Sequence, residues 1–537
     1  MYRLSLLLLL VLASLWGHAS CPERATTPLA ELRSGAVEEG ERVVVDGVVT
    51  ATFLADEQLG GFYLQQDGQP PSALFVYAPR MAEGELRPGS RVQLSGRFAR
   101  FHGRPQLTRP RDLHDCGHVG LPSPQPLQLP KPKQKLEALA GVKVTLQQTL
   151  TVSGNYELAR YGTLTLSAHG RLWRADEPRA ANTRRIELDD GSYRANPRPI
   201  PYLNPEGTRR SGSTVEGLTG ILEHAFDSWR IHPTRAPRFV EANPRPEPLP
   251  SPGDALRIAT FNVENYFLTL GQRGAANRDE LQRQRDKLRA AVRGLDADIL
   301  ALVEVENRPQ ALADLLRQLN AEWPEEQQYH ILAHPHSGSD AIKVALLYRP
   351  ARVKSLGAAA DRDRVHNRAP LLGWFQPKAG GEPFGVVAVH FKAKVGCPRS
   401  GDIDRGEGCW NRLRTEQAEK LAAWIDEQRR EEWAVMVAGD LNAYLDERPL
   451  QRFAQAGKRD LVALRQQPRQ GYSYVFRAQA GRLDYLLASE SLHGRVVDAG
   501  IWHINADEPP FLAYDGEAPG DGPWRSSDHD PVWVELH

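Results

Sequence analysis

The sequence predicts an α/β layered domain at the C-terminal end of the chain, preceded by one or two small β-rich modules. Three observations lead to this prediction. The chain has 537 residues, which is too long for one hydrophobic core. Two Pro-rich stretches, "LPSPQPLQLPKPK" and "NPRPEPLPSPGD", divide it. Apolar strand patterns alternate with helical patterns only after the second stretch, and that alternation is typical of an α/β domain.

The first residues predict an exported protein. The segment "MYRLSLLLLLVLASLWGHAS" has one basic residue, then an apolar run, then small residues. This pattern indicates a signal peptide over residues 1–19 with cleavage after Ala19, too short to anchor stably in a membrane. Cys21 leaves lipidation as an alternative, which His18 disfavours. We expect a secreted or periplasmic protein without stable membrane insertion.

The overall charge does not indicate a particular partner. Lys and Arg together number 67, as do Asp and Glu, so the formal net charge is zero. A nucleic acid or membrane would therefore have to be held by a local patch or by a metal.

The four cysteines predict two disulfides. An even number in an exported chain is typical of disulfide bonding, and four residues allow three pairings. The local choice pairs Cys21 with Cys116 around the first module and Cys397 with Cys409 across a short loop. No two of these cysteines are close enough in sequence to favour a metal site.

Residues 20–118 are expected to form a small β domain. The runs "RVVVDGVVTATF", "GFYLQQ", "ALFVYA" and "RVQLSGRFARF" are β-rich and separated by Gly, Pro and Asp, and "HGRPQLTRPRDL" is a candidate fifth strand. Five short strands in about 100 residues suit a small barrel such as an OB-fold. A Pro-rich linker over residues 119–134 follows.

A second β module is expected at residues 135–244. Ser90–Phe98 and Ser213–Leu222 share a spacing of Val, Leu, Ser or Thr, and Gly. This similarity suggests that the second module repeats the first and is also OB-like. Residues 245–254 form the second linker.

Residues 255–537 carry the α/β pattern. The strands expected are "LRIATFNV", "DILALVEV", "KVALLYRP", "GVVAVHFKA", "WAVMVAGDLN" and "RLDYLLAS". Helices are expected around Asp279–Leu295, Pro309–Asn320 and Leu413–Arg430. The closing "PVWVEL" alternates apolar and other residues, which predicts that the terminus is tied into a sheet as a half-buried strand.

Polar residues recur where these strands end or begin. Strand ends meet at one rim of a sheet, so such side chains can share a cleft. Histidines, carboxylates and amides without cysteine suit a hard cation together with acid–base groups. The candidates are Asn262, Glu304, His390, Asp440, Asn442, Asp484, Asp528 and His529.

Several of these residues also have a purely structural explanation. His390 alone would more often be a core histidine, and Asp440 and Asn442 are common turn residues. Either Glu304 or its neighbour Glu306 could be surface charge, although the position after "DILALV" favours Glu304. Taken together, a structural explanation for every candidate is improbable.

The motifs "TFNVEN", "LALVEVEN", "VAVHFK", "GDLNAY", "RLDYLL" and "SSDHDPV" resemble, in order, those of the endonuclease/exonuclease/phosphatase superfamily, which includes DNase I and exonuclease III. The resemblance covers residues 255–537. It implies a DNase I-like, four-layered α/β sandwich of two mostly antiparallel sheets with helices outside. The stretches "GEGCWNRLRTEQAEKLAAWI" and "WHINADEP", after an OB-like region, are most similar to bacterial extracellular nucleases of the ExeM type.

This resemblance implies a metal site. Asn262 and Glu304 would hold a divalent metal, and Asp528 would assist. Mg²⁺ is the natural choice because it takes few protein carboxylates, with Mn²⁺ as a substitute. Ca²⁺ is a further candidate cofactor, and the loop between Cys397 and Cys409, which carries acidic residues, is one place it could bind.

The resemblance also implies catalytic roles. Asp440 would orient the attacking water, and Asn442 would contact the phosphate. His529, oriented by Asp484, would polarise the water or stabilise the transition state. His390 would act as the acid for the leaving oxygen.

Four further residues are candidate substrate contacts because they lie near the expected rim. They are Asn265, Asp340, Arg349 and Lys392.

The function expected is that of a monomeric, secreted, metal-dependent endonuclease that hydrolyses extracellular DNA, with RNA as an alternative substrate. One rival is a lipid or inositol-phosphate phosphodiesterase of the same superfamily, although the sequence has no clear apolar element for membrane contact. A second rival is a catalytically inactive nucleic-acid-binding protein, which the intact set of candidates disfavours.

Overall fold

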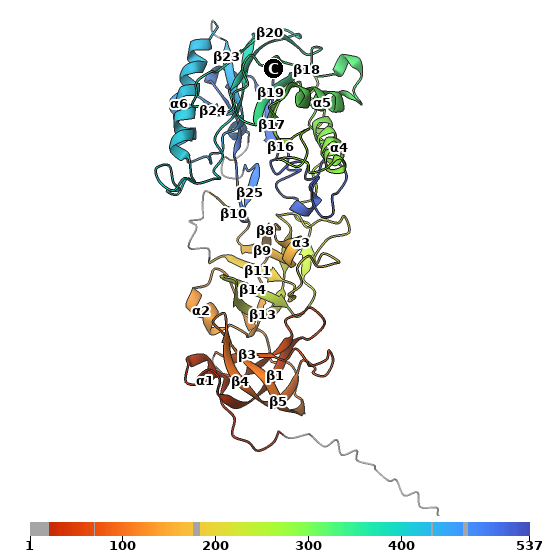
Figure 1. The fold of residues 1–537 in the computed structure, drawn as a ribbon, viewed down its shortest axis with the longest axis vertical. Helices are drawn as coiled ribbons and strands as arrows, with labels where there is room; N and C mark the ends of the chain where they lie inside the picture. The colour runs from red at the N-terminus through yellow and green to blue at the C-terminus, as the bar shows by residue number, and fades with distance from the viewer. Residues whose placement is uncertain (1–20, 69, 175–182, 431–432, 466–470) are drawn as a thin grey trace, which may run out of the picture. The chain divides into compact units, whose positions relative to one another are not determined.

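The computed structural model describes residues 21–68, 70–174, 183–430, 433–465 and 471–537 (Figure 1). The expected signal peptide over residues 1–19 lies outside the described residues. The chain divides into two compact units. Unit 1 comprises Met1–Gln147, Ile186–Ala195 and Gly217–Pro237, and unit 2 comprises Gln148–Arg185, Asn196–Glu216 and Arg238–His537. None of the described helices is long and apolar enough to cross a membrane.

A closed five-stranded barrel forms the first part of unit 1. Its strands are ordered β1-β2-β3-β5-β4 around the barrel. Alternating apolar residues of these strands fill the interior, where helix α1 (Leu29–Ser34), which the sequence did not predict, contributes Leu29 and Leu32. The strands are β1 (Arg42–Phe53), β2 (Gly61–Gln66), β3 (Ser72–Tyr77), β4 (Ser90–Phe101) and β5 (Arg104–His118).

Both disulfides have the predicted local pairing. Cys21 is bonded to Cys116 in β5, within unit 1. Cys397 is bonded to Cys409 within unit 2. All four cysteines are therefore used in disulfides.

The remaining strands of unit 1 form an open ladder in the order β6-β7-β13-β14-β11, next to helix α2 (Lys133–Ala138) in sequence. In unit 2, the corresponding ladder is β15-β12-β8-β9, with the short helix α3 (Leu158–Tyr161). The bounds are β6 (Gln125–Pro126), β7 (Lys143–Leu146), β8 (Leu150–Gly154), β9 (Thr163–Ala168), β11 (Arg185–Asp189), β12 (Thr214–Glu216), β13 (Leu218–Ala225), β14 (Ser228–Pro233) and β15 (Arg238–Val240).

The predicted second module therefore differs from the structure. Residues 135–244 are shared between the two units, and in neither unit do their described strands close into a barrel. The second module does not repeat the first, and the reason is local. Ser90–Phe98 lies in one continuous strand, whereas Ser213–Leu222 is divided at Gly217, whose φ is +60°. The strands on either side of Gly217 pair with different neighbours.

The rest of unit 2 contains two six-stranded sheets. Their strand orders are β18-β19-β17-β16-β29-β28 and β20-β21-β22-β23-β27-β24. The first sheet consists of β16 (Leu256–Tyr266), β17 (Ile299–Glu306), β18 (His330–Ile331), β19 (Ile342–Tyr348), β28 (Val496–Ile501) and β29 (Val532–Leu536). The second consists of β20 (Val353–Ala360), β21 (Leu371–Pro377), β22 (Phe384–His390), β23 (Ala434–Asp440), β24 (Arg459–Asp460) and β27 (Asp484–Ala488).

Four layers result from the alternation of side chains along these strands. In β16, Ile258 packs between the sheets, while Ala259 packs against the helices outside. The helices α4 (Arg278–Leu295) and α5 (Pro309–Asn320) cover the first sheet, and α6 (Asn411–Gln428) and α7 (Arg448–Gln455) cover the second (Figure 1). The three predicted helices are therefore confirmed, with α4 capped by the Asn277 side chain.

Shorter elements complete unit 2. Strands β10 (Leu172–Trp173), β25 (Tyr474–Phe476) and β26 (Gln479–Gly481) form a small sheet. Helix α8 (Glu490–His493) and the 3₁₀ turns η1 (Glu325–Gln327), η2 (Val462–Leu464) and η4 (Pro510–Leu512) lie in connections.

The C-terminal strand is tied into the sheet as the sequence predicts. β29 lies between β16 and β28, with Leu536 opposite Leu256 and Val532 opposite Thr260. Its residues alternate between buried and partly buried positions. The residues just before it are therefore held at a fixed edge of the sheet.

Unit 1 contains a buried imidazole between two carboxylates. The ring nitrogens of His232 each lie 3.2 Å from a carboxylate oxygen, one from Asp189 and one from Glu223. Burial lowers the pKa of His232, but the two carboxylates raise it more, to about 9. The charged imidazole therefore stabilises the folded unit below pH 6.5, and this contribution is lost as the pH rises through about 9.

We expect the free energy of unfolding of unit 1 to fall between pH 6.5 and about 9. The measurement is calorimetric unfolding of the full chain across this range. A His232→Gln variant should lose that pH dependence, whereas His224→Gln, a change at an exposed histidine of the same hairpin, should keep it. An identical slope in the His232→Gln variant would contradict this explanation.

Candidate active site

The strand registers bring the predicted residues to one rim of the two sheets. In the second sheet, His390 ends β22 opposite Asp440, which ends β23, and Asp440 faces Asp484 at the start of β27. In the first sheet, Asn262 in β16 lies opposite Val303, the residue before Glu304 in β17. Side chains distant in sequence are therefore neighbours at this rim.

Asn262 connects the two sheets. Its Nδ2 donates to Glu304 Oε1 at 3.1 Å and to Asp440 Oδ2 at 3.4 Å. Glu304 Oε2 also accepts a hydrogen bond from the backbone N–H of Asn265 at 3.1 Å. Glu304 and Asn265 both have positive φ, a conformation that non-glycine residues adopt rarely and that is concentrated at functional sites.

Asn442 and His390 complete the side of the rim formed by the second sheet. The backbone N–H of Asn442 donates to Asp440 Oδ1 at 2.7 Å, and its side-chain Nδ2 donates to the Phe391 carbonyl at 3.2 Å. His390 Nε2 lies 3.6 Å from Asp440 Oδ2 and 3.8 Å from Glu304 Oε1. These distances place His390 beside the carboxylates without a short ion pair.

His529 is paired with Asp484. The distance from Nδ1 of His529 to Oδ2 of Asp484 is 2.7 Å, and the Ser473 hydroxyl donates to the same carboxylate oxygen at 2.6 Å. The Tyr474 ring lies 4.7 Å from the imidazole. Burial lowers the pKa of His529, but Asp484 and then Asp528 raise it more, to well above its usual value. The imidazole is therefore protonated at neutral pH.

His390 is in the opposite charge state. Burial of the imidazole and then the Arg368 guanidinium hold the pKa of His390 well below its usual value. Its Nδ1 is buried and has no hydrogen-bond partner among the described residues. His390 is therefore neutral at neutral pH, which does not support the expected role as the acid.

Several carboxylates are crowded at the rim. Burial and then Asp484 raise the pKa of Asp440 to about 7. Burial and then Asp528 raise the pKa of Glu304, and the same two causes raise the pKa of Glu264 well above its usual value. Like charges buried together are unfavourable unless a cation lies between them.

The donor set fits a hard divalent cation. Asp440 is a buried carboxylate and Glu304 a partly buried one beside the Asn262 amide, and Asp528 is partly exposed, with its Oδ1 4.0 Å from His529 Nε2. Asp440, Asp484 and His529 have ligand atoms within 4.8 Å of one another, but Asp484 and His529 are already bonded to each other. Mg²⁺ prefers carboxylate oxygens of this kind, whereas Asn262 directs its Nδ2 to them and its Oδ1 accepts from the backbone N–H of Glu264 at 3.0 Å.

The candidate substrate contacts have different positions. Asp340 accepts a hydrogen bond from Arg368 Nη1 at 3.0 Å and lies 3.6 Å from Arg273. Lys392 follows β22 and lies 5.3 Å above the Trp410 ring. Asn265 is at the rim through its hydrogen bond to Glu304.

Arg349 is not at the rim, contrary to the prediction. Because β19 is antiparallel to β17, its last residue, Tyr348, pairs with Ile299 at the start of β17, far from Glu304. The Arg349 guanidinium is buried, bonds to Asp296 at 2.6 Å and lies 4.3 Å from the Trp323 ring. Its role is structural.

Glu306 also has a structural role. Its carboxylate accepts hydrogen bonds from the backbone N–H groups of Leu268 and Thr269 and from the Thr269 hydroxyl. It therefore fixes the loop after β16. This contact separates Glu306 from Glu304, which points to the rim.

Arg368 is a rim residue that the sequence did not reveal. Its Nε donates to the His390 carbonyl at 3.1 Å, and a second nitrogen donates to the Phe391 carbonyl. It is a single arginine in the loop "HNRAP", with no motif that marks it.

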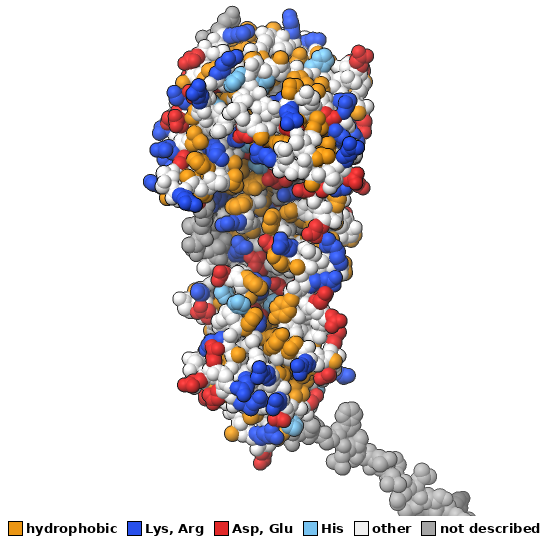
Figure 2. Space-filling view, in the orientation of Figure 1, with side chains coloured by type: hydrophobic (Ala, Val, Ile, Leu, Met, Phe, Trp, Pro, Cys, Tyr) orange, Lys and Arg blue, Asp and Glu red, His pale blue; other side chains and the backbone are white. Residues whose placement is uncertain are grey.

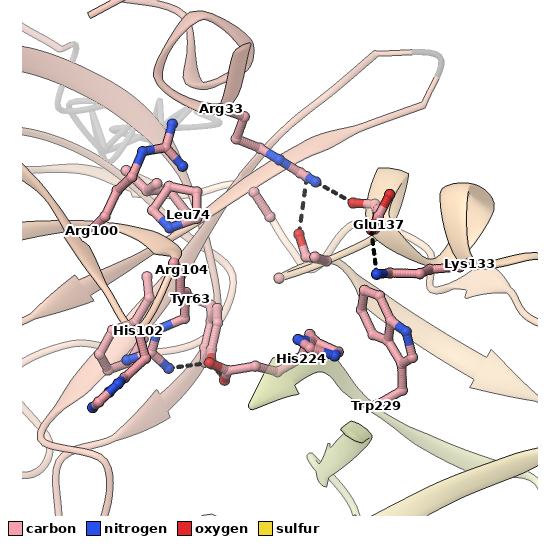
Figure 3. Close-up of a pocket in the computed structure, with 17 residues that line it drawn as sticks. Arg33, Tyr63, Leu74, Arg100, His102, Arg104, Lys133, Glu137, His224 and Trp229 are labelled. Carbon is pink, nitrogen blue, oxygen red and sulfur yellow. Dashed lines mark hydrogen bonds and ion pairs between the residues drawn. The ribbon is translucent and has the colours of Figure 1, made fainter. Parts of the chain in front are cut away.

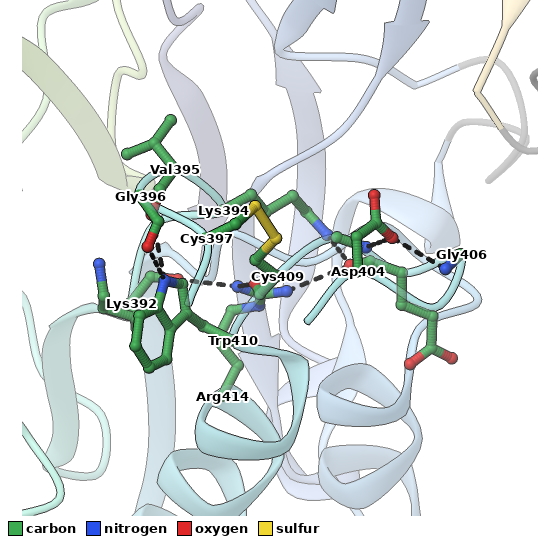
Figure 4. The surroundings of a disulfide bond; sticks show 12 residues. Lys392, Lys394, Val395, Gly396, Cys397, Asp404, Gly406, Cys409, Trp410 and Arg414 are labelled. Carbon is green, nitrogen blue, oxygen red and sulfur yellow. Dashed lines mark hydrogen bonds between the residues drawn. A yellow bond between two sulfur atoms is a disulfide. The ribbon is translucent and has the colours of Figure 1, made fainter. Parts of the chain in front are cut away.

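The disulfide loop lies beside Lys392, whose side chain lies over the Trp410 ring (Figure 4). The Trp410 indole donates to the carbonyls of Val395 and Gly396.

The acidic loop between Cys397 and Cys409 is an unsuitable Ca²⁺ site because its carboxylates accept hydrogen bonds from the nearby backbone. Asp404 accepts from the backbone N–H groups of Gly406 and Gly408. Asp402 accepts from two backbone N–H groups at the start of α6.

Comparisons with solved structures give similarities that are confined to about half of this chain. The catalytic domain of human Nocturnin with bound sulfate is 18% identical, covering 53% of this chain and 94% of that one, with a TM-score of 0.37. A mannosyl-6-phosphatase of Bacteroides thetaiotaomicron is 18% identical, covering 52% and 99%, with a TM-score of 0.35. D. rerio TDP2 complexed with single-strand DNA product is 15% identical, covering 53% and 99%, with a TM-score of 0.35.

No curated protein matches the sequence. The model of the Endonuclease/Exonuclease/phosphatase family matches residues 259–529, which is half of the chain and includes the whole rim from Asn262 to His529. The chain belongs to the endonuclease/exonuclease/phosphatase family.

Proposed function

We propose that the protein is a secreted, metal-dependent endonuclease that hydrolyses phosphodiester bonds of extracellular DNA, with RNA as an alternative substrate. One observation carries this proposal. The imidazole of His529, held by Asp484, has a ring nitrogen within 4.8 Å of a carboxylate oxygen of Asp440, a member of the Asn262–Glu304–Asp440 cluster. The family supports a hydrolase that acts on phosphate esters.

The arrangement supports in-line attack by water. Hydrolysis of a phosphodiester needs an oriented nucleophile, neutralisation of charge and a proton for the leaving oxygen. Asp440 orients the water and accepts its proton, and Asn442 contacts the phosphate. Asp484 keeps His529 protonated. The imidazolium of His529 stabilises the negative charge of the transition state and supplies a proton to the leaving oxygen. His390, being neutral, donates a hydrogen bond to a phosphate oxygen.

The metal-binding residues are Asn262 and Glu304, with Asp528 assisting. Members of this family usually use divalent metals. Mg²⁺ or Mn²⁺ at this site would neutralise charge on the phosphate and on the crowded carboxylates. The raised pKa values of Glu304 and Asp440 support a site that requires a cation.

The barrel of unit 1 supports a polymeric substrate. We assign it as an OB-like module, since its five strands close in the order β1-β2-β3-β5-β4. On the face drawn in Figure 2, basic side chains gather over part of the barrel. Basic side chains bind the phosphates of a nucleic acid, and aromatic rings stack on its bases.

A cavity of about 480 Å³ in unit 1 is lined by both basic and aromatic side chains (Figure 3). The Trp229 and His224 rings form one wall, with their centroids 4.9 Å apart. The basic residues that line the cavity are Arg33, Arg100, Arg104 and Lys133.

The predicted signal peptide and the two disulfides support our proposal of secretion by a bacterium, into the medium or the periplasm. We propose a monomer that acts without membrane insertion. A lipid phosphodiesterase remains the alternative from the same family, and an inactive binding protein is the alternative from another class.

We expect purified protein to convert supercoiled plasmid to nicked and linear DNA with Mg²⁺ and to lose this activity with EDTA. His529→Ala and Asp440→Ala should each lower the rate about 10²-fold or more while the fold is kept. Gel electrophoresis of plasmid and phosphocholine release from sphingomyelin liposomes are measured in parallel. Cleavage of the lipid alone would reject the proposal, and no cleavage of either would favour the inactive binding protein.

Mg²⁺ should raise the melting temperature of unit 2, because a bound cation relieves repulsion between buried carboxylates. In Glu304→Gln this rise should be largely lost. The matched control is Glu306→Gln, two residues away, whose carboxylate bonds to the loop after β16. Calorimetry with and without Mg²⁺ makes the comparison. An equal rise in wild type and Glu304→Gln would show that the metal binds elsewhere.

A further inference from the structure

His529 is held by a loop that comes before it in sequence. We call residues 503–508 the anchor loop. Asn505 Nδ2 donates to the His529 carbonyl at 2.6 Å, and Asn505 Oδ1 accepts from the backbone N–H of Ser526 at 2.8 Å. Asp530 Oδ1 accepts from the backbone N–H groups of Asn505 and Ala506. The backbone around His529 is therefore fixed by the anchor loop on both sides.

The anchor loop ends in two buried carboxylates, Asp507 and Glu508, both fully inaccessible to solvent. Three arginines from an earlier part of unit 2 neutralise them. Arg171 bonds to Asp507 at 2.7 Å, Arg210 bonds to Glu508 at 2.6 Å, and Arg245 bonds to Glu508 at 2.9 Å. Two buried charges of this kind are stable only when they are paired.

Arg210 makes the most complete set of contacts. Besides Glu508, its Nη2 donates to the His503 carbonyl at 2.8 Å, at the other end of the anchor loop. Its Nε donates to the Asn243 carbonyl at 3.1 Å. A single guanidinium therefore spans the anchor loop from His503 to Glu508. Burial would raise the pKa of Asp507, but Arg171 and Arg210 lower it to about 2, so that carboxylate stays charged.

A second connection reaches the same histidine from another side. Strand β10 pairs with β26 in parallel, with Leu172 opposite Gln479. β26 pairs with β25, which carries Tyr474, and the Tyr474 ring lies 4.7 Å from the His529 ring. The segment that supplies Arg171 and Arg210 therefore also supports the aromatic neighbour of His529.

We propose that Arg171 and Arg210 are positioning residues for His529, acting through the anchor loop. The family model begins at residue 259, so these two arginines lie outside it. The described residues 148–174, 183–185 and 196–216 of unit 2 are then part of the working active site. This inference rests on the proposed role of His529 in hydrolysis.

The physical reason is geometric. Net stabilisation by a buried ion pair is small, but the pair selects one conformation over others. A displacement of about 1 Å in a catalytic group can cost about 10²-fold in rate. Without Arg210, the buried Glu508 carboxylate keeps only part of its charge neutralisation. The anchor loop is then favoured to move, and the His529 backbone moves with it.

Arg209 provides a matched control. It is the neighbouring residue and is also buried, but its side chain donates to the Tyr202 carbonyl at 2.7 Å, pairs with Glu241 and lies 4.0 Å from the Phe239 ring. Those contacts do not include the anchor loop. Arg209→Ala and Arg210→Ala therefore remove equal side chains with different partners.

The first measurement is hydrogen exchange of the full chain by mass spectrometry. In Arg210→Ala, the amides of residues 525–530 should exchange about tenfold faster than in wild type. In Arg209→Ala, they should be unchanged. If Arg210→Ala does not fold, Arg210→Lys, which keeps the charge but not the span, is measured with Arg209→Lys as its control. Equal protection of the amides of residues 525–530 in the paired variants overturns the proposal.

The second measurement is the rate of hydrolysis of plasmid DNA and of bis(p-nitrophenyl) phosphate, well below the melting temperatures. Arg210→Ala should lower kcat about 10²-fold with little change in KM, and Arg210→Lys should recover part of the loss. Equal kcat for the Arg209 and Arg210 variants overturns the proposal. If wild type cleaves neither substrate, the proposed function fails, whereas hydrogen exchange still decides whether Arg210 positions the His529 turn.

Discussion

The hydrogen bond between Asp484 and His529 is the interaction on which the rest of the site depends. Asp484 begins β27 in one sheet, and His529 precedes β29 in the other, so this 2.7 Å contact joins the two halves of the sandwich. It also sets the charge of His529, because a buried imidazole without a carboxylate would be neutral. His390, which makes no short ion pair and whose pKa is lowered by burial and then by Arg368, is the neutral imidazole at the same rim.

The packing between the sheets makes that contact possible. Ile258 and Val534 from the first sheet pack with Met436 and Leu486 from the second in one core. A rigid core of this kind fixes the separation of the two rims. Carboxylates that repel one another can then be held close together, and a divalent cation is the natural way to balance them. The crowded carboxylates lower the stability of the fold at this rim, where the chemistry requires charged groups.

Much of this could be predicted from the sequence, because the strands and helices of the α/β part have strong periodicity. Helix α5 has the predicted bounds, and the strand after His529 is confirmed. Asn262, Glu304, Asp440 and His529 meet because polar residues at strand ends share a rim. Arg349 was wrongly expected there, because its position depends on whether β19 runs parallel or antiparallel to β17. Strand direction is not encoded in a short apolar run.

Other features depend on contacts between distant segments, which a single sequence does not reveal. Arg368 lies in an unremarkable loop but bonds to the backbone after β22. The arrangement of residues 135–244 depends on a break at Gly217. The neutral state of His390 depends on burial and on Arg368.

The most direct test of the account is the Asp484→Asn variant. This change keeps the size and hydrogen-bonding capacity of the side chain but removes the charge that keeps His529 protonated. Plasmid cleavage with saturating Mg²⁺ is the measurement. The account predicts a loss in kcat of about 10²–10⁴-fold with the fold and Mg²⁺ binding retained. A variant that cleaves plasmid at the wild-type rate would contradict it.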